Sequence, residues 1–322
     1  MNLARVAREV LLRIVAALGI MLGASAVLFF GMNALPGDAA LAALGNQSGN
    51  TEVVEQLRVD YGLNRNVFAR YGDWLIGAVH GDFGTSLSTG IPVWKLIESS
   101  VRNTLALTSI VVIALLVLAL LLGVVSALRS GGLVDNFIAV VSLIFVATPE
   151  FVMGAVLILV LSSGLGLLPS ASLLDPSLPT LAQPSLLVLP ALTLVLVTVA
   201  QATRMVRAAM IQVLDSDYIQ ASVLRGVPMR RIVWRHALPN ASDATVQVMA
   251  LTIGWLVSGV VVTEALFNYP GLGSTIVKSV ASQDVSTVVA ASMLVTAAYV
   301  FVQLIAEVVT ILVDPKLRRG TQ

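Results

Sequence analysis

Long apolar runs dominate this sequence and limit what it can fold into. Hydrophobic residues make up 57% of the 322 positions and charged residues only 11%, whereas soluble domains carry about 25% charged residues. Several runs exceed the ~18 apolar residues that a helix needs to cross a bilayer. So few charges could not solvate the surface of a water-soluble protein. The sequence therefore predicts an all-α membrane protein with one domain over residues 1–322.

Six transmembrane helices can be placed on these runs, and an even number puts both termini on the same side. The first run is longer than the apolar core of a signal peptide and leads into LPGDAA without an A-x-A-like cleavage site, so we expect it to remain as an anchor. The expected spans lie at about 10–34, 103–128, 136–163, 185–208, 244–266 and 287–313.

Lysine and arginine are unevenly distributed among the connecting segments. Basic residues flank the first span, follow the second, end the chain and gather in the segment 209–243. The segment 36–102 instead carries five basic residues balanced by seven acidic ones. The positive-inside rule therefore predicts cytoplasmic termini, a cytoplasmic loop at 209–243 and an extracytoplasmic loop at 36–102.

Several kinds of chemistry are not expected of this sequence. It contains no cysteine, and its two histidines, His80 and His236, fall on opposite sides of the membrane in this topology, so no metal site is predicted. None of its three lysines belongs to a Gly-Lys-Ser/Thr phosphate loop, and no G-x-S-x-G elbow occurs. We expect no catalytic residue, no cofactor and no nucleic-acid partner for this chain.

Three glutamates lie at membrane depth, where an unpaired charge is costly. Glu264 and Glu307 lie near the ends of spans, and we expect them to snorkel to the interface or to cap a helix. Glu150 is deeper and follows Pro149, so it either lines a polar path or satisfies a contact between helices. Glu150 and the neighbouring Thr148 are the candidates for a path across the membrane.

Glycine and proline mark expected helix contacts and bends. Gly19 and Gly23 form a small-xxx-small pair in the first span, which either allows close packing of another helix or reflects the general frequency of glycine in such helices. Pro149 and Pro190 should kink or locally unwind the third and fourth spans.

The loop 209–243 has a helix-turn-helix pattern. Asp215 or Asp217 can N-cap a short helix at about 218–225, and Gly226 can end it. Pro228 suits the first turn of a second helix, and Pro239 should end that helix.

The second helix of this loop is amphipathic in sequence. Met229, Ile232, Val233 and His236 share one face, and Arg230, Arg231 and Arg235 lie on the others, which predicts an apolar tip with a basic rim. This pattern fits a protein docking surface, and the alternative is that the basic residues hold the loop at anionic lipid.

The same loop resembles the EAA motif of ABC-importer permeases, whose pattern is E-A-A, three residues, G, nine residues, I-x-L-P. The first Glu, the second Ala and the Ile differ here, but the local sequence is similar to the peptide/nickel branch of that family. Further matches to this branch follow in order: LPGDAA at 35–40, YGL at 61–63, HGDFGTSLSTGIPV at 80–93, TPEF at 148–151, ALFNYPGLG at 265–273 and DPKLR at 314–318.

The resemblance implies a type I importer permease, the first (B-type) permease subunit, in a prokaryotic plasma membrane. Its implied partners are membrane lipid, a second related permease, two ATPase subunits that hold ATP and Mg, and an extracytoplasmic binding protein. The loop 36–102 would be part of the platform for the binding protein, or would only close the outer opening of the translocation path. The implied ATPase-coupling residues are Gln220, Ala221, Ser222, Gly226, Pro228, Met229, Arg230, Arg231, Ile232, Arg235, His236, Leu238 and Pro239.

Three functions remain open from the sequence. The leading one is import of di- or oligopeptides, with nickel chelates, glutathione and sugars as other possible solutes of the same importer type. A self-sufficient ion-coupled transporter would need paired deep charges or two interrupted helices in matching halves. An intramembrane protease would need a nucleophile with a base, or two acids at one depth, and no such pair is visible.

Overall fold

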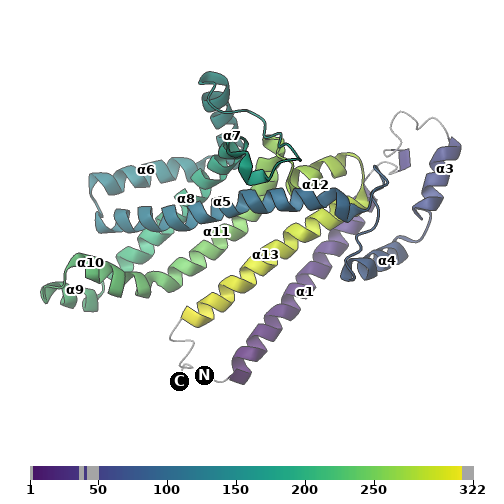
Figure 1. Cartoon of the computed structure of the whole chain (residues 1–322). Helices are drawn as coiled ribbons and strands as arrows, with labels where there is room; N and C mark the ends of the chain where they lie inside the picture. The colour runs from purple at the N-terminus through teal and green to yellow at the C-terminus, as the bar shows by residue number, and fades with distance from the viewer. Residues whose placement is uncertain (1–2, 36–39, 42–50, 314–322) are drawn as a thin grey trace.

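The computed structural model describes residues 3–35, 40–41 and 51–313 (Figure 1). Every regular element in these ranges is a helix, which confirms the all-α prediction. Five helices are long and apolar enough to cross a membrane. They are α1 (Leu3–Ala34), α5 (Val93–Leu128), α8 (Pro184–Leu214), α11 (Leu238–Leu266) and α13 (Val285–Val313).

The sixth expected span is broken into two parts. Helix α6 (Leu133–Ala147) and helix α7 (Glu150–Leu157), which continues into the π-helix η2 (Ile158–Gly164), meet at an angle of 105°. Thr148 at the break has an extended backbone (φ −95°, ψ 123°), because the ring of Pro149 disfavours the helical conformation of the residue before it. The predicted kink at Pro149 is therefore confirmed, and six spans result only if α6 and α7 count as one.

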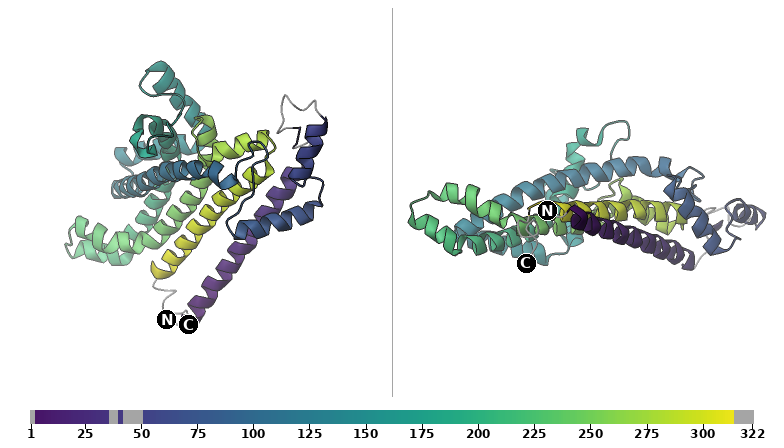
Figure 2. Two further views of the ribbon diagram at one scale, coloured as in Figure 1. Left: turned by 45° about the vertical axis from the view of Figure 1, so that its right-hand side comes forward. Right: turned by 90° about the horizontal axis from the view of Figure 1, so that it is seen from below.

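Helix α8 is the centre of the bundle. It packs against α5, α6, α7 and α11, while α13 packs against α11 and α1 lies at the edge beside α13 (Figures 1 and 2). Gly123 of α5 allows a close approach to α8, because a Cβ atom there would lie 2.6 Å from Cγ1 of Val206. The buried core of this contact is made of small and branched apolar side chains, including Leu115, Ala119, Ala202, Val206 and Met210.

The structure bears on two expectations about helix packing. Pro190 does not interrupt α8, which runs as one helix from Pro184 to Leu214. Pro190 lies in its second turn, where few preceding carbonyls are disturbed. A Cβ atom on Gly19 or Gly23 would have no described atom outside its own stretch of α1 within 4 Å. Within the described residues the pair mediates no helix contact, which agrees with the alternative that glycine is simply frequent in such helices.

The segment 36–102 is partly helical. Helix α3 (Thr51–Asp60) and helix α4 (Val67–Val79) occupy its middle, and α5 already begins at Val93, well before the predicted start of the second span at 103. The helix extends past the apolar run because Pro92 supplies the N-cap and because Val93 and Ile97 are buried against α12 (Leu272–Ala281) and α13. The short 3-10 helix η3 (Thr180–Ala182) lies in the loop before α8.

Candidate functional site

The loop after α8 contains the two predicted short helices. Helix α9 (Asp217–Leu224) has Ser216 as its N-cap, not Asp215 or Asp217, and Asp215 instead ends α8. Gly226 follows α9 with a left-handed backbone (φ +76°), as a helix-terminating glycine does. Helix α10 (Met229–Ile232) begins after Pro228, as expected.

The second short helix does not end at Pro239. Helix α10 passes into the π-helix η4 (Val233–Ala237) and then directly into α11, so the chain is helical from Met229 to Leu266. The ring of a proline normally clashes with the carbonyl four residues earlier. The wider π-helical turn just before Pro239 relieves that clash. The prediction that Pro239 ends the second helix was therefore wrong.

The exposed side of this loop differs from the predicted apolar tip. Ile232 and Val233 are buried, because they face the rest of the chain at the foot of α11. The apolar side chains that protrude most are Leu224, Met229 and Trp234, whose exposed fractions are 88%, 50% and 65%. We call these three residues and the exposed arginines around them, Arg230, Arg231 and Arg235, the loop surface.

The predicted coupling residues thus fall into three groups. Two of these residues, Ser222 and Ile232, are buried. Two others, His236 and Leu238, are partly exposed. The remaining residues are exposed: Gln220, Ala221, Gly226, Pro228, Met229, Arg230, Arg231, Arg235 and Pro239.

A cleft of about 730 Å³ with several polar side chains lies between α6 and α8. Its lining includes Ser142 of α6, Gln201, Arg204 and Arg207 of α8, and Trp255 of α11. The guanidinium of Arg204 is exposed and has no hydrogen bond or ion pair with any residue of the described ranges. The cleft therefore presents an unpaired positive charge on the side of a membrane helix.

The two predicted path residues lie beside this cleft and do not line it. The hydroxyl of Thr148 donates a hydrogen bond to the carbonyl of Ile144 (2.8 Å). The carboxylate of Glu150 lies directly against Gly259 of α11, where it occupies the space that a Cβ atom would need. It accepts no hydrogen bond from the described part of the chain. Gly259 lies one helical turn beyond Trp255, so Glu150 continues the polar side of α6, α8 and α11.

Glu264 does not snorkel to the interface. It is fully buried, and its carboxylate accepts hydrogen bonds from the Thr104 hydroxyl (2.6 Å) and from the Gly273 backbone N–H (2.6 Å). Gly273 is in the first turn of α12, so Glu264 caps that helix, and the capping half of the prediction is correct. Beside it, burial and the Glu264 carboxylate raise the pKa of Tyr269. The side chain of Glu307 lies outside the described residues.

Sequence reasoning missed two buried aspartates. Asp135 in the first turn of α6 forms a bidentate ion pair with Arg207 and accepts a hydrogen bond from Ser126 (2.5 Å). Asp284 precedes α13 and accepts hydrogen bonds from Ser86 (2.5 Å) and from the Thr287 hydroxyl (2.8 Å). An aspartate directly before an apolar helix is an N-cap signal that could have marked Asp284.

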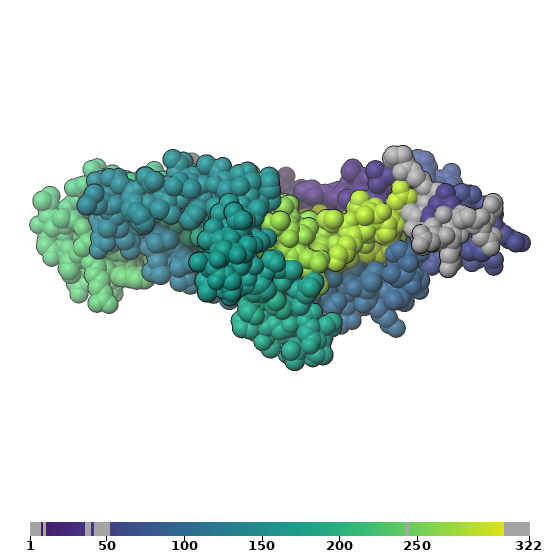
Figure 3. Space-filling model, turned by 90° about the horizontal axis from the view of Figure 1, so that it is seen from above, coloured from purple at the N-terminus to yellow at the C-terminus, as the bar shows by residue number. Residues whose placement is uncertain are grey.

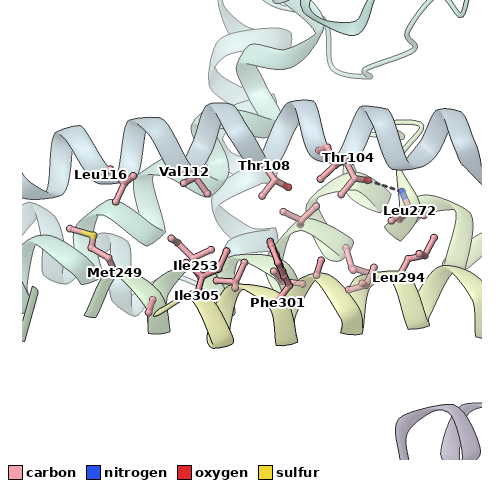
Figure 4. A pocket seen from close by; sticks show the side chains of 18 of the residues that line it. Thr104, Thr108, Val112, Leu116, Met249, Ile253, Leu272, Leu294, Phe301 and Ile305 are labelled. Atoms are coloured by element: carbon pink, nitrogen blue, oxygen red, sulfur yellow. Dashed lines mark hydrogen bonds between the residues drawn. The ribbon is translucent and has the colours of Figure 1, made fainter. Parts of the chain in front are cut away.

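A second cavity, also of about 730 Å³, lies between α5, α11 and α13 (Figure 4). Apart from threonines such as Thr104 and Thr108, its labelled side chains are apolar, including Leu116, Met249 and Phe301 (Figure 4). A surface of this kind suits hydrocarbon or an apolar helix and offers no partner for a charged solute.

The sequence comparisons identify this architecture. Residues 119–319 match the binding-protein-dependent transport system inner membrane component family, and residues 6–108 match its N-terminal membrane-component family. The chain belongs to this family. It is therefore a membrane permease of the ABC-importer type, resident in the inner membrane.

Curated relatives extend over nearly the whole chain. An oligopeptide transport system permease protein of Bacillus subtilis is 33% identical over 97% of this chain and 99% of its own length. A probable D,D-dipeptide transport system permease protein of Escherichia coli is 30% identical over 92% of the chain and 94% of its own length. A metal-staphylopine import system permease protein of Staphylococcus aureus is 29% identical over 90% of both chains.

Proposed function

We propose that this permease forms half of a translocation path for peptides and is driven through its loop surface by separate ATPase subunits. A second, related permease supplies the other half of the path, and an extracytoplasmic binding protein delivers the solute. ATP and Mg bind to the ATPase subunits, and this chain contributes no catalytic group, cofactor or metal site.

The observation that carries the coupling proposal is the continuity of α10, η4 and α11. No non-helical residue separates Met229 in the loop from Leu266 at the far end of α11. A push on Met229 or Trp234 is therefore transmitted along one helix into the bundle. Exposed apolar side chains within a basic rim also fit a docking site for a partner protein, because a bare lipid anchor needs only the positive charges.

The polar side of α6, α8 and α11 is the proposed wall of the path. Arg204 and Glu150 both lie in membrane helices and have no hydrogen-bond or ion-pair partner among the described residues. Leaving such charges in contact with lipid is costly, so this side must face water or protein. The second permease would cover it and enclose an aqueous path, whereas the apolar cavity between α5, α11 and α13 faces hydrocarbon or an apolar helix.

Peptides are the proposed solutes because relatives over the full chain are named for peptide transport. A peptide zwitterion also complements a wall that offers the guanidinium of Arg204 and the carboxylate of Glu150, neither of which pairs with a described residue. Metal chelates are the second candidate, since the Staphylococcus aureus relative is named for metal-staphylopine import.

The test is purification of the native assembly followed by reconstitution into liposomes. A second permease and P-loop ATPases should co-purify, and uptake of labelled dipeptides should require ATP and binding protein on opposite sides. Trp234→Ala should reduce ATPase recovery, whereas Trp94→Ala, which removes another exposed tryptophan in the first turn of α5, should not. Uptake that follows a proton gradient and ignores ATP would contradict the proposal and favour an ion-coupled transporter.

A further inference from the structure

Helix α4 exposes a continuous apolar face. Phe68, Ile76 and Val79 are spaced so that they share one side of the helix, and their exposed fractions are 70%, 64% and 79%. Gly72 lies on the same side between them. The described part of the chain leaves these side chains largely uncovered, and only the ring of Phe68 has an aromatic neighbour, in Phe30 of α1.

The adjacent side of α4 is fixed to α1. The Tyr71 hydroxyl lies 2.9 Å from the Ser25 hydroxyl, and the guanidinium of Arg70 donates a hydrogen bond to the Asn33 side chain (3.0 Å). The rings of Phe30 and Phe68 are 5.2 Å apart. Figures 1 and 2 show α4 alongside the upper part of α1, not beyond its end.

These contacts give the depth of α4 in the membrane. The membrane-crossing part of α1 is Leu11–Ala34, so Ser25 lies roughly 13 Å below the end of that span at 1.5 Å per residue. The contacts of α4 thus run from the level of Ser25 to Asn33, one residue before the end of the span. This places α4 beside the last turns of that span, near the membrane surface, where interfacial helices bury their apolar side by about 5–10 Å.

Polar side chains mark the water-facing edge of the same helix. Asp73 forms an exposed ion pair with Arg65 (2.8 Å), and His80 at the C-terminal end is exposed. Tyr71 and Trp74 lie on the α1 side, and such aromatic rings are enriched at membrane interfaces. The order around the helix is thus protein contact, apolar face and polar edge.

We propose that α4 is an interfacial helix whose face of Phe68, Ile76 and Val79 is inserted among the acyl chains of the adjacent membrane leaflet. Its partner is phospholipid, not a second protein. Only 17% of the apolar window of the neighbouring span is buried within this chain, so α4 lies at the edge of the bundle beside a surface that suits acyl chains. Helix α4 thereby fixes the level of the outer segment relative to the bilayer.

The absence of cysteine allows a direct test. Single cysteines replace Ile76 or Val79 in the full chain, and Asp73→Cys is the matched control on the polar edge of the same helix. Each variant is spin-labelled and reconstituted into phosphatidylcholine vesicles, alone and in the assembly with its partner subunits. Collisions of the label with lipid-soluble oxygen and with a water-soluble nickel chelate are then measured.

The expected result is high oxygen and low nickel-chelate accessibility at positions 76 and 79, with the ratio reversed severalfold at position 73. This pattern of accessibility should be the same with and without the partner subunits. High nickel-chelate accessibility at position 76 would place the face in water and overturn the proposal. Protection from both reagents in the assembly would show that a protein covers the face, and would also overturn it.

Discussion

Arg207 holds Asp135 by two parallel hydrogen bonds, Nε to Oδ1 at 2.6 Å and Nη2 to Oδ2 at 2.7 Å. The pair joins the first turn of α6 to the second half of α8. The charge distribution predicts that this half lies toward the cytoplasm. Ser126 and the Gly131 N–H complete the shell around the carboxylate. The tight turn between α5 and α6 is therefore fastened to the helix that leads into the loop surface.

Removing the arginine of this pair should destabilise the permease. Arg207→Gln leaves the Asp135 carboxylate buried without its counter-charge, and breaking a buried pair in this way is strongly unfavourable. The thermal unfolding midpoint of the purified chain should fall by several degrees. Arg204→Gln is the matched control, because Arg204 is one turn away and unpaired; its midpoint should stay unchanged while peptide uptake falls. Equal midpoints for both variants would contradict this assignment.

Gly226 should tolerate only residues that accept a left-handed backbone. Its φ of +76° costs a residue with a Cβ atom roughly 1–2 kcal/mol, and a β-branched side chain is worst placed there. Gly226→Val should therefore leave the subunit inserted but reduce ATP-dependent uptake and ATPase recovery. Gly226→Asn should retain most of both, since asparagine enters this conformation more readily. Full coupling in the valine variant would show that the turn geometry is unimportant.

Local sequence patterns predicted the features that depend on near neighbours. The apolar runs gave the class of protein, Pro149 gave the break between α6 and α7, and Gly226 gave the turn after α9. Each follows from a rule that acts within a few residues.

Features that depend on distant partners could not be predicted in this way. Arg207 and Asp135 are 72 positions apart, and Ser86 and Asp284 are 198 apart. Helical periodicity placed Ile232 on an apolar face but could not say that the rest of the chain covers that face. Tertiary packing decides which side of an amphipathic helix is exposed.

Asp284 should hold the segment after α4 in place. Its carboxylate accepts hydrogen bonds from the hydroxyls of Ser86 and Ser88. It also accepts one from the Leu87 N–H at 3.4 Å. Asp284→Ala leaves these donors without an acceptor, so amide hydrogen exchange around Ser86 should speed up severalfold. Asp82→Ala serves as the control, because the exposed Asp82 accepts only the Gly84 N–H among the contacts described. Unchanged exchange in the Asp284 variant would argue against this role.

Gly273 should be essential for the contact between α11 and α12. A Cβ atom there would collide with the Val261 backbone, whose carbonyl oxygen would be only 2.9 Å away. Gly273→Ala should cost about 1–3 kcal/mol, as overpacking does, and should lower the unfolding midpoint. Gly19→Ala places the same methyl group where no described atom outside its own stretch of α1 lies within 4 Å, so its midpoint should not fall. A stable Gly273→Ala variant would mean that α12 can move away at little cost.

Glu150 and Glu264 should respond differently to the same isosteric change. Glu150→Gln removes a charge that no described residue pairs with, so the unfolding midpoint and assembly should be preserved while peptide uptake changes. In Glu264→Gln the amide can accept only one of the two hydrogen bonds from Thr104 and Gly273. The donor left buried costs about 1–3 kcal/mol, so this variant should unfold at a lower temperature. Normal uptake by Glu150→Gln would remove Glu150 from the path and assign it to the contact between α7 and Gly259.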